Sequence, residues 1–122
     1  MALDRGLAER PFCYLETTGR VSGEPRVVEM WFAADAAGER IFMLSGGGDR
    51  SHWVRNLRRR AAVRVRIGET WFPGQAHEVG PGPDDSLARE LLAGKYQGWR
   101  PGAALSGWAR TALPVEIRLM TE

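Results

Sequence analysis

The sequence has 122 residues, of which 43% are hydrophobic and 26% charged, with a formal net charge of +2 at pH 7. These values suit one globular domain over residues 1–122 and argue against a disordered or fibrous chain. No apolar run approaches the roughly 20 residues that span a bilayer, and residues 1–11 lack the apolar core of a signal peptide. We therefore expect no integral membrane association and a cytoplasmic location.

The two histidines lie far apart, and Cys13 is the single cysteine. Cys13 therefore cannot form an internal disulfide, and we expect it to be a small core residue. This residue set offers no ligand spacing that zinc or iron requires, so no metal site is predicted.

Positive charge is concentrated in the middle of the chain, where seven arginines fall between Arg50 and Arg66. Such local charge favours an anionic partner: a small molecule, a phosphate or a nucleic acid. In the segment 63–67, Arg64 and Arg66 alternate with apolar residues, but no aromatic residue is interleaved with them in the sequence. Nucleic acid is therefore not expected as a partner, and these arginines should face water or a dimer interface.

The first half of the chain is predicted to be mainly β-structure. Residues 1–10 are read as a short N-terminal tail or a single helical turn. Segments 12–18 and 26–33 are rich in β-forming residues and flank a polar turn, which predicts a hairpin with a long cationic loop. A third strand is expected over 40–44.

A run of three glycines, Gly46 to Gly48, follows the third strand and leads into a predicted helix. Asp49 or Ser51 is expected to cap that helix, with Trp53 and Leu57 on one face. Backbone amides at a glycine turn and the dipole of the following helix both favour bound anions. The spacing matches neither the Walker pattern nor the dinucleotide fingerprint.

The second half is predicted to contain three strands and a helix. Strand 63–67 alternates strictly, and strand 70–79 contains Pro73 and Gly74, which suggest an edge position or a bulge. Asp84 or Asp85 is expected to cap a helix that runs to about residue 96. Segment 98–113 is expected to be a loop with a short helix that covers an apolar pocket, and 115–119 is the closing strand.

The fold class predicted from these elements is α+β: a partly open antiparallel barrel of about six strands with two or three helices. Short connections favour antiparallel pairing, and the helices are too few to cover both faces of a parallel sheet. Barrels of this kind bind ligands at their mouths or against a partner subunit.

Two cationic, glycine-containing turns are the candidate binding elements. Arg20 and Arg26 flank the first, and Arg50 and the amides of Gly46 to Gly48 belong to the second. Guanidinium groups and loop amides suit a phosphate or carboxylate, and Trp31 with Trp53 could enclose a planar ring. No dedicated acid or base is evident, which favours chemistry supplied by a cofactor. Tyr14 and Tyr96 could donate a proton, but we assign no catalytic residue.

Three motifs, in this order, resemble the deazaflavin-dependent nitroreductase family: Thr-Thr-Gly-Arg-Val-Ser-Gly-Glu-Pro-Arg at 17–26, Leu-Ser-Gly-Gly-Gly at 44–48, and Trp-Val-Arg-Asn-Leu at 53–57. That family belongs to the split β-barrel superfamily, together with the flavin mononucleotide-binding pyridoxamine phosphate oxidases. The resemblance extends over about residues 12–79. It implies a homodimeric split barrel that binds coenzyme F420 and passes its hydride to a nitro compound, a quinone or an activated alkene.

The resemblance also implies which residues bind the cofactor. Arg20, Ser22 and Arg26 would contact its phosphate and polyglutamate tail. Ser45, Gly46 and Gly47 would hold the phosphate through backbone amides, and Trp53 and Asn56 would border the same cleft. We add Arg50 on grounds of charge and proximity in the sequence.

Two positions depart from the family pattern. Val21 stands where many members have a basic residue, and Glu29 stands where they have a proline. The N-terminal extension is also short, so the covering helix of some relatives is not expected. These departures keep flavin mononucleotide as the alternative cofactor and a non-catalytic cofactor carrier as the alternative function.

Overall fold

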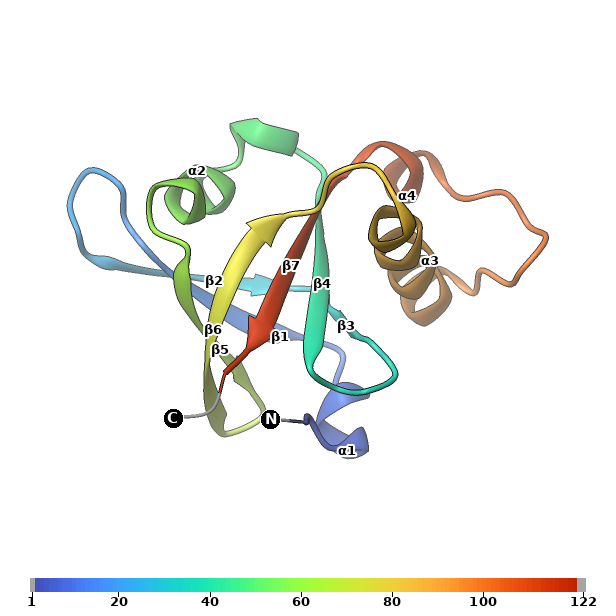
Figure 1. Cartoon of the computed structure of the whole chain (residues 1–122), viewed down its shortest axis with the longest axis horizontal. Coiled ribbons are helices and arrows are strands. Elements are labelled where there is room, and N and C mark those ends of the chain that lie inside the picture. Colours follow the sequence, from blue (N-terminus) through green and yellow to red (C-terminus); the bar gives the residue numbers. More distant parts are fainter. Residues whose placement is uncertain (1, 121–122) are drawn as a thin grey trace.

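The computed structural model describes residues 2–120, which form one seven-stranded antiparallel sheet with helices around it (Figure 1). The strands are β1 (Cys13–Thr18), β2 (Pro25–Met30), β3 (Ala33–Ala34), β4 (Arg40–Ser45), β5 (Ala62–Ile67), β6 (Thr70–Glu78) and β7 (Leu113–Leu119). The α-helices are α1 (Arg5–Ala8), α2 (His52–Arg59), α3 (Pro83–Gln97) and α4 (Gly107–Thr111), and a 3-10 turn, η1, covers Gly48–Arg50. No helix within these residues is long and apolar enough to cross a membrane.

The sheet curls into a barrel because one chain segment supplies both of its edges. The strand order is β2-β1-β5-β6-β7-β4-β3, so β2 and β3 are the two edge strands. Only Trp31 and Phe32 separate them in the sequence. The segment 25–34 therefore pairs with β1 at one edge of the sheet and, through β3, with Ile41 and Phe42 of β4 at the other edge.

Alternation along the strands separates the barrel interior from its outer surface. Leu15, Val65 and Ile117 are fully buried in the interior core. On the outside, α3 packs over Phe42 and Leu44 of β4 and makes a second, smaller core. Strands β5 and β7 present apolar residues to the interior at every second position, as their sequence patterns predict.

Helix α2 closes one end of the barrel. Trp53, Val54 and Leu57 are buried there and join the interior core. The β1–β2 hairpin projects beside α2, whereas α3 and α4 lie on the other side of the barrel (Figure 1). This arrangement brings the first cationic turn next to the start of α2.

The predicted α+β antiparallel barrel is confirmed, with differences in its parts. The predicted strand 26–33 is divided into β2 and β3, which gives seven strands in place of about six. Four short or medium helices replace the expected two or three, since the N-terminal turn and the short helix in 98–113 both form. Cys13 is buried and free, as expected.

The helix starts were predicted less accurately. Helix α2 has Ser51 at its N-cap position without a side-chain cap, and Asp49 lies in the preceding 3-10 turn. Helix α3 begins at Pro83 after Gly82, so Asp84 and Asp85 occupy its first turn instead of the cap. Proline at the first helical position needs no hydrogen-bonded amide, which explains the earlier start.

Strand β6 is central and pairs with β5 in continuous register through Pro73 and Gly74, so the expected edge position or bulge is corrected on both counts. Pairing with β7 reaches only as far as Gly74, so Pro73 lies just beyond the paired stretch. A Cβ atom on Gly74 would stand 2.6 Å from Cγ2 of Ile117. Glycine is needed here because β7 passes so close.

Candidate functional site

A cavity of about 550 Å³ lies between the β1–β2 turn and helix α2, and we name it the cation cavity. Strand β2 also contributes to its wall through Val27 and Val28. Five of the nine predicted site residues line it: Arg20, Ser22, Arg26, Trp53 and Asn56. The first cationic turn and the helix that follows the glycine run therefore share one cavity.

Arg20 is fixed in this cavity by helix α2. Asn56 is buried, and its Oδ1 accepts a hydrogen bond from Nη1 of Arg20 at 2.9 Å and one from the backbone N–H of Arg20 at 3.2 Å. The Asn56 Nδ2 group donates to Oγ1 of Thr17 on β1 at 3.1 Å. A neutral amide therefore positions the guanidinium without neutralising its charge.

Arg26 and Ser22 form the second half of the cationic turn. Nη2 of Arg26 donates to Oγ of Ser22 at 3.2 Å, and the same oxygen accepts from the backbone N–H of Glu24 at 3.1 Å. Within residues 2–120, no carboxylate oxygen lies within 4 Å of a guanidinium nitrogen of Arg20 or Arg26. Two uncompensated positive charges on one cavity favour an anionic ligand.

The glycine turn lies beside the cation cavity and not in its wall. Ser45 is buried, and its Oγ donates to the carbonyl of Gly48 at 2.9 Å and lies 2.7 Å from Oγ of Ser51. Ser45 thus holds the turn together from inside. Gly46, Gly47 and Arg50 are exposed and lie outside the residues that line the cavity. Their contact with a cofactor stays a prediction.

Trp31 and Trp53 do not enclose one ring site, which corrects the expectation from sequence. Trp53 is buried and lines the cation cavity. Trp31 follows β2 and lines a different cavity with Trp108 of α4, in agreement with the expectation that segment 98–113 covers an apolar pocket. Residue type alone indicated two aromatic walls, but their placement depends on the break between β2 and β3.

Comparison with known proteins identifies the family. The model of the F420H(2)-dependent quinone reductase family matches residues 3–118. The chain belongs to this family. The F420H(2)-dependent quinone reductase Rv1261c of Mycobacterium tuberculosis is 26% identical over 117 residues, which cover 91% of this chain and 73% of that protein.

Solved structures show the same fold. An F420-H2 dependent reductase (FDR-A) is 24% identical with a TM-score of 0.63, and the alignment covers 97% of both chains. A structure described as a domain-swapped dimer is 26% identical with a TM-score of 0.66, covering 95% of this chain and 81% of the other. The predicted split-barrel fold is thereby confirmed. The family match confirms an F420-dependent oxidoreductase with F420 as its cofactor.

Six residues that line the cation cavity were not among the predicted site residues, and two of them, His52 and Thr17, make polar contacts there. Nη2 of Arg20 lies 3.2 Å from Nδ1 of His52. A guanidinium can only donate, so this contact is a hydrogen bond in which Nδ1 of His52 accepts. The spacing of His52 and Asn56, four residues apart on one helix face, was the available signal.

One argument against nucleic acid was wrong. The guanidinium of Arg64 lies 4.4 Å from the ring centroid of Trp71, and that of Arg66 lies 4.2 Å from the ring centroid of Tyr14. Neighbouring strands β1 and β6 supply these aromatic residues, so the sequence order of β5 does not reveal them. The arginines cover the rings, which leaves less aromatic surface for bases, and the absence of a nucleic-acid partner stays a prediction.

The two tyrosines considered as proton donors have raised pKa values. A hydrogen bond from the Tyr14 hydroxyl to Glu29 at 2.9 Å raises the pKa of Tyr14. Burial raises the pKa of Tyr96. Neither residue lines the cation cavity, and no catalytic role is assigned to them.

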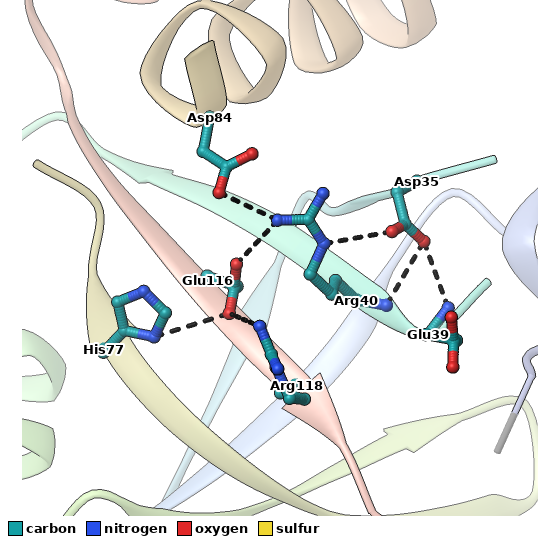
Figure 2. Close-up of polar contacts among 7 residues, drawn as sticks. All are labelled: Asp35, Glu39, Arg40, His77, Asp84, Glu116 and Arg118. Carbon is teal, nitrogen blue, oxygen red and sulfur yellow. Dashed lines mark hydrogen bonds and ion pairs between the residues drawn. The ribbon is translucent and has the colours of Figure 1, made fainter. Parts of the chain in front are cut away.

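A second polar cluster, drawn in Figure 2, lies on the outer face of the barrel. Nη1 of Arg40 lies 2.9 Å from both Asp84 Oδ2 and Glu116 Oε2, and Nε lies 3.0 Å from Asp35 Oδ2. The side chain of Glu116 is 1% exposed, and its Oε1 forms no hydrogen bond within residues 2–120. Arg40 therefore joins helix α3 and strand β7 to strand β4, and the cluster is structural.

Proposed function

We propose that this chain reduces quinones with F420H(2) and that the cation cavity holds the acidic end of the cofactor. The observation that carries the placement is the pair Arg20 and Arg26, which share a cavity and have no carboxylate within 4 Å in residues 2–120. Reduced F420, when bound, supplies the hydride that, with a proton, converts a quinone to a hydroquinone. The chain's own residues bind and orient the reactants.

The residues of the cation cavity suit a phosphate with an acidic tail. Arg20 is held rigidly by Asn56 and His52, so little side-chain freedom is lost when an anion binds. Arg26 and the hydroxyl of Ser22 supply further donors on the opposite side of the turn. Val21 is 94% exposed and contributes no charge, so the tail has fewer cationic partners than the family pattern provides.

The glycine turn is proposed to complete the phosphate site through the amides of Gly46 and Gly47. Both residues are exposed and directly precede the turn and helix that carry His52 and Asn56. A Cβ atom on Gly47 would lie 2.7 Å from Oγ of Ser51, so a larger residue there would displace the Ser51 hydroxyl from its contact with Ser45. Arg50 is proposed as a peripheral contact.

We also propose that the protein is a single-domain homodimer that acts in the cytoplasm. The similar structure described as a domain-swapped dimer supports the dimer. Light scattering coupled to size-exclusion chromatography tests the dimer directly. A molar mass near 13.6 kDa at micromolar concentration would reject it.

Fluorescence titration with oxidised F420 tests the placement of the cofactor. Hydrogen bonds from charged groups contribute about 1.5–3 kcal/mol each, so Arg20→Gln and Arg26→Gln should each raise the Kd about tenfold or more. Arg59→Gln is the matched control, because Arg59 is exposed on α2 and lies outside the cavity lining. Unchanged Kd values for both cavity variants would show that the anion binds elsewhere.

A turnover assay distinguishes a reductase from a non-catalytic cofactor carrier. Oxidation of reduced F420 on addition of menadione, followed by absorbance, is the expected result. Tight binding of F420 with no oxidation by any quinone would favour the carrier.

A further inference from the structure

A second cavity, the tryptophan cavity, lies where β2 ends. Its volume is about 440 Å³, within the range of about 300–1,000 Å³ usual for small-molecule sites. It is lined by Glu29, Met30, Trp31, Leu44, Gln97 and Trp108. Because Val27 and Val28 line the cation cavity, the two cavities occupy consecutive stretches of the same strand.

The aromatic walls of the tryptophan cavity are held at a right angle. Trp31 stacks on Tyr96 with centroids 4.3 Å apart and an interplanar angle of 2°, and Trp108 meets Trp31 edge-on at 5.5 Å and 89°. The Tyr96 hydroxyl accepts from the Phe32 N–H at 3.0 Å and lies 2.9 Å from the Phe32 carbonyl oxygen. Trp31 therefore has one face covered by a fixed ring, and it is still 39% exposed.

Hydrogen-bond donors remain free at this corner. Within residues 2–120, the indole N–H groups of Trp31 and Trp108 have no acceptor, whereas that of Trp99, outside the cavity, donates to the Ala103 carbonyl at 2.8 Å. Oε1 of Gln97 accepts from Ser106 at 2.8 Å, which leaves the Gln97 amide N–H groups available. The cavity thus combines aromatic surface with donors that suit carbonyl oxygens.

The charge of the tryptophan cavity is opposite to that of the cation cavity. Glu29 is its one ionisable lining residue, and neither lysine nor arginine lines it. An anionic ring would be repelled by this carboxylate. A neutral planar ring with carbonyl oxygens has no such penalty and meets both the indole surface and the donors.

We propose that the tryptophan cavity binds the electron acceptor and that Glu29 selects neutral quinones over anionic ones. This inference rests on the proposed quinone reductase function and assigns the acceptor to a site on this chain. In this arrangement, the arginines of the cation cavity bind the acidic cofactor, and the tryptophans of the tryptophan cavity bind the uncharged quinone ring. Consecutive residues of β2 place the two ligands side by side.

Steady-state kinetics with two quinones test the proposal. Trp108→Leu should raise the KM for menadione about tenfold while the Kd for F420 changes less than twofold. Glu29→Gln should lower the ratio of the KM for anionic 2-hydroxy-1,4-naphthoquinone to that for menadione by about two- to fivefold, because Glu29 is exposed and solvent screens its charge. Trp99→Phe is the matched control and should leave both KM values and the F420 affinity unchanged.

Several results would overturn this assignment. A tenfold loss of F420 affinity in Trp108→Leu would mean that the cofactor ring occupies the cavity. Unchanged KM values and an unchanged ratio would place the acceptor elsewhere while the reductase activity stands. If Trp108→Leu does not fold by circular dichroism, Trp108→Phe replaces it, with a smaller increase in KM expected because the N–H donor is lost and the ring is kept.

Calorimetric titration of the cofactor-free protein with menadione separates this proposal from the proposed function. Binding that weakens about tenfold in Trp108→Leu supports the cavity even if no turnover is found. Absence of binding to the cofactor-free protein, together with equal KM values for all variants, would reject the cavity and leave the F420 site untouched.

Discussion

The Arg40 cluster gives the sharpest stability prediction. In Arg40→Met, the Glu116 carboxylate, 1% exposed, loses the guanidinium that lies 2.9 Å away. Removing one partner of a buried ion pair costs about 3–5 kcal/mol, and we expect the lower end of this range because the Arg118 guanidinium stays 3.5 Å from Oε1 of Glu116. For a domain of this size, that corresponds to a fall in melting temperature of about 10 °C or more. Urea denaturation followed by circular dichroism measures the change directly.

Two further variants make this prediction specific. Arg59→Met removes an exposed arginine and should change the free energy of unfolding by less than about 0.5 kcal/mol. Adding Glu116→Leu to Arg40→Met should recover part of the loss, because the buried charge of Glu116 is removed with its partner while Asp35 still lacks the Arg40 guanidinium. A loss below about 1 kcal/mol in Arg40→Met, or no recovery in the double variant, would refute the reasoning.

The effect of Arg40→Met should also depend on pH. Burial alone would raise the pKa of Asp35. Hydrogen bonds from the Arg40 side chain and from the backbone N–H groups of Arg40 and Glu39 outweigh the effect of burial, so the pKa lies below its usual value. Such a carboxylate stabilises the fold above its unfolded pKa, near 3.9, and this stability is lost as the pH falls through the folded pKa. The difference between wild type and Arg40→Met should therefore narrow below about pH 4. A difference that stays constant to pH 3 would contradict this.

Three other predictions follow from single residues. Burial lowers the pKa of Lys95 to about 8 in the folded protein, whereas an unfolded lysine titrates near 10.4. Between about pH 8 and pH 10.4 the unfolded chain therefore binds more protons, and the free energy of unfolding of the wild type should rise with pH relative to that of Lys95→Met. Urea titrations across this pH range measure the difference. Gly74→Ala should cost about 1–3 kcal/mol by thermal melting because of the close contact to β7, whereas Gly80→Ala, with no atom within 4 Å of the new Cβ, should be nearly neutral. Asn56→Asp should keep Arg20 in place but neutralise it, so the fluorescence Kd for F420 should rise about tenfold with the fold intact.

The regular strands could be predicted because a period of two is visible in the sequence. Val63, Val65 and Ile67 alternate with arginines, and the structure places them in the interior core. The division at Trp31 and Phe32 could not be predicted in this way. Both residues favour strands, and the break arises because the segment must leave β1 and reach β4 to close the barrel. Local strand propensity does not indicate where the chain must change its pairing partner.

The cation cavity was predicted in part through residue types and in part through the resemblance. The motifs gave Arg20 and Asn56, but not the hydrogen bond between two residues 36 positions apart. His52 was missed because its spacing of four residues from Asn56, although it places both on one helix face, does not by itself distinguish a histidine that contacts Arg20 from one that faces solvent. The placement of Trp31 and Trp53 in different cavities was missed for the same reason as the break between β2 and β3. Both features depend on how the chain closes the barrel.

The break between β2 and β3 also leaves one edge of β2 unpaired. Had residues 25–30 paired with β4 on their free side, another strand would cover the edge of β2, whose residues line both cavities. Its sequence resists such pairing, because Pro25 lacks an amide hydrogen and Arg26 and Glu29 place charges on the strand. The exposed pattern along β2 agrees with this. Strand β2, an edge strand of the sheet, thus lines both the proposed cofactor site and the proposed acceptor site. The opposite charges of Arg26 and Glu29 favour a different ligand at each end of the strand.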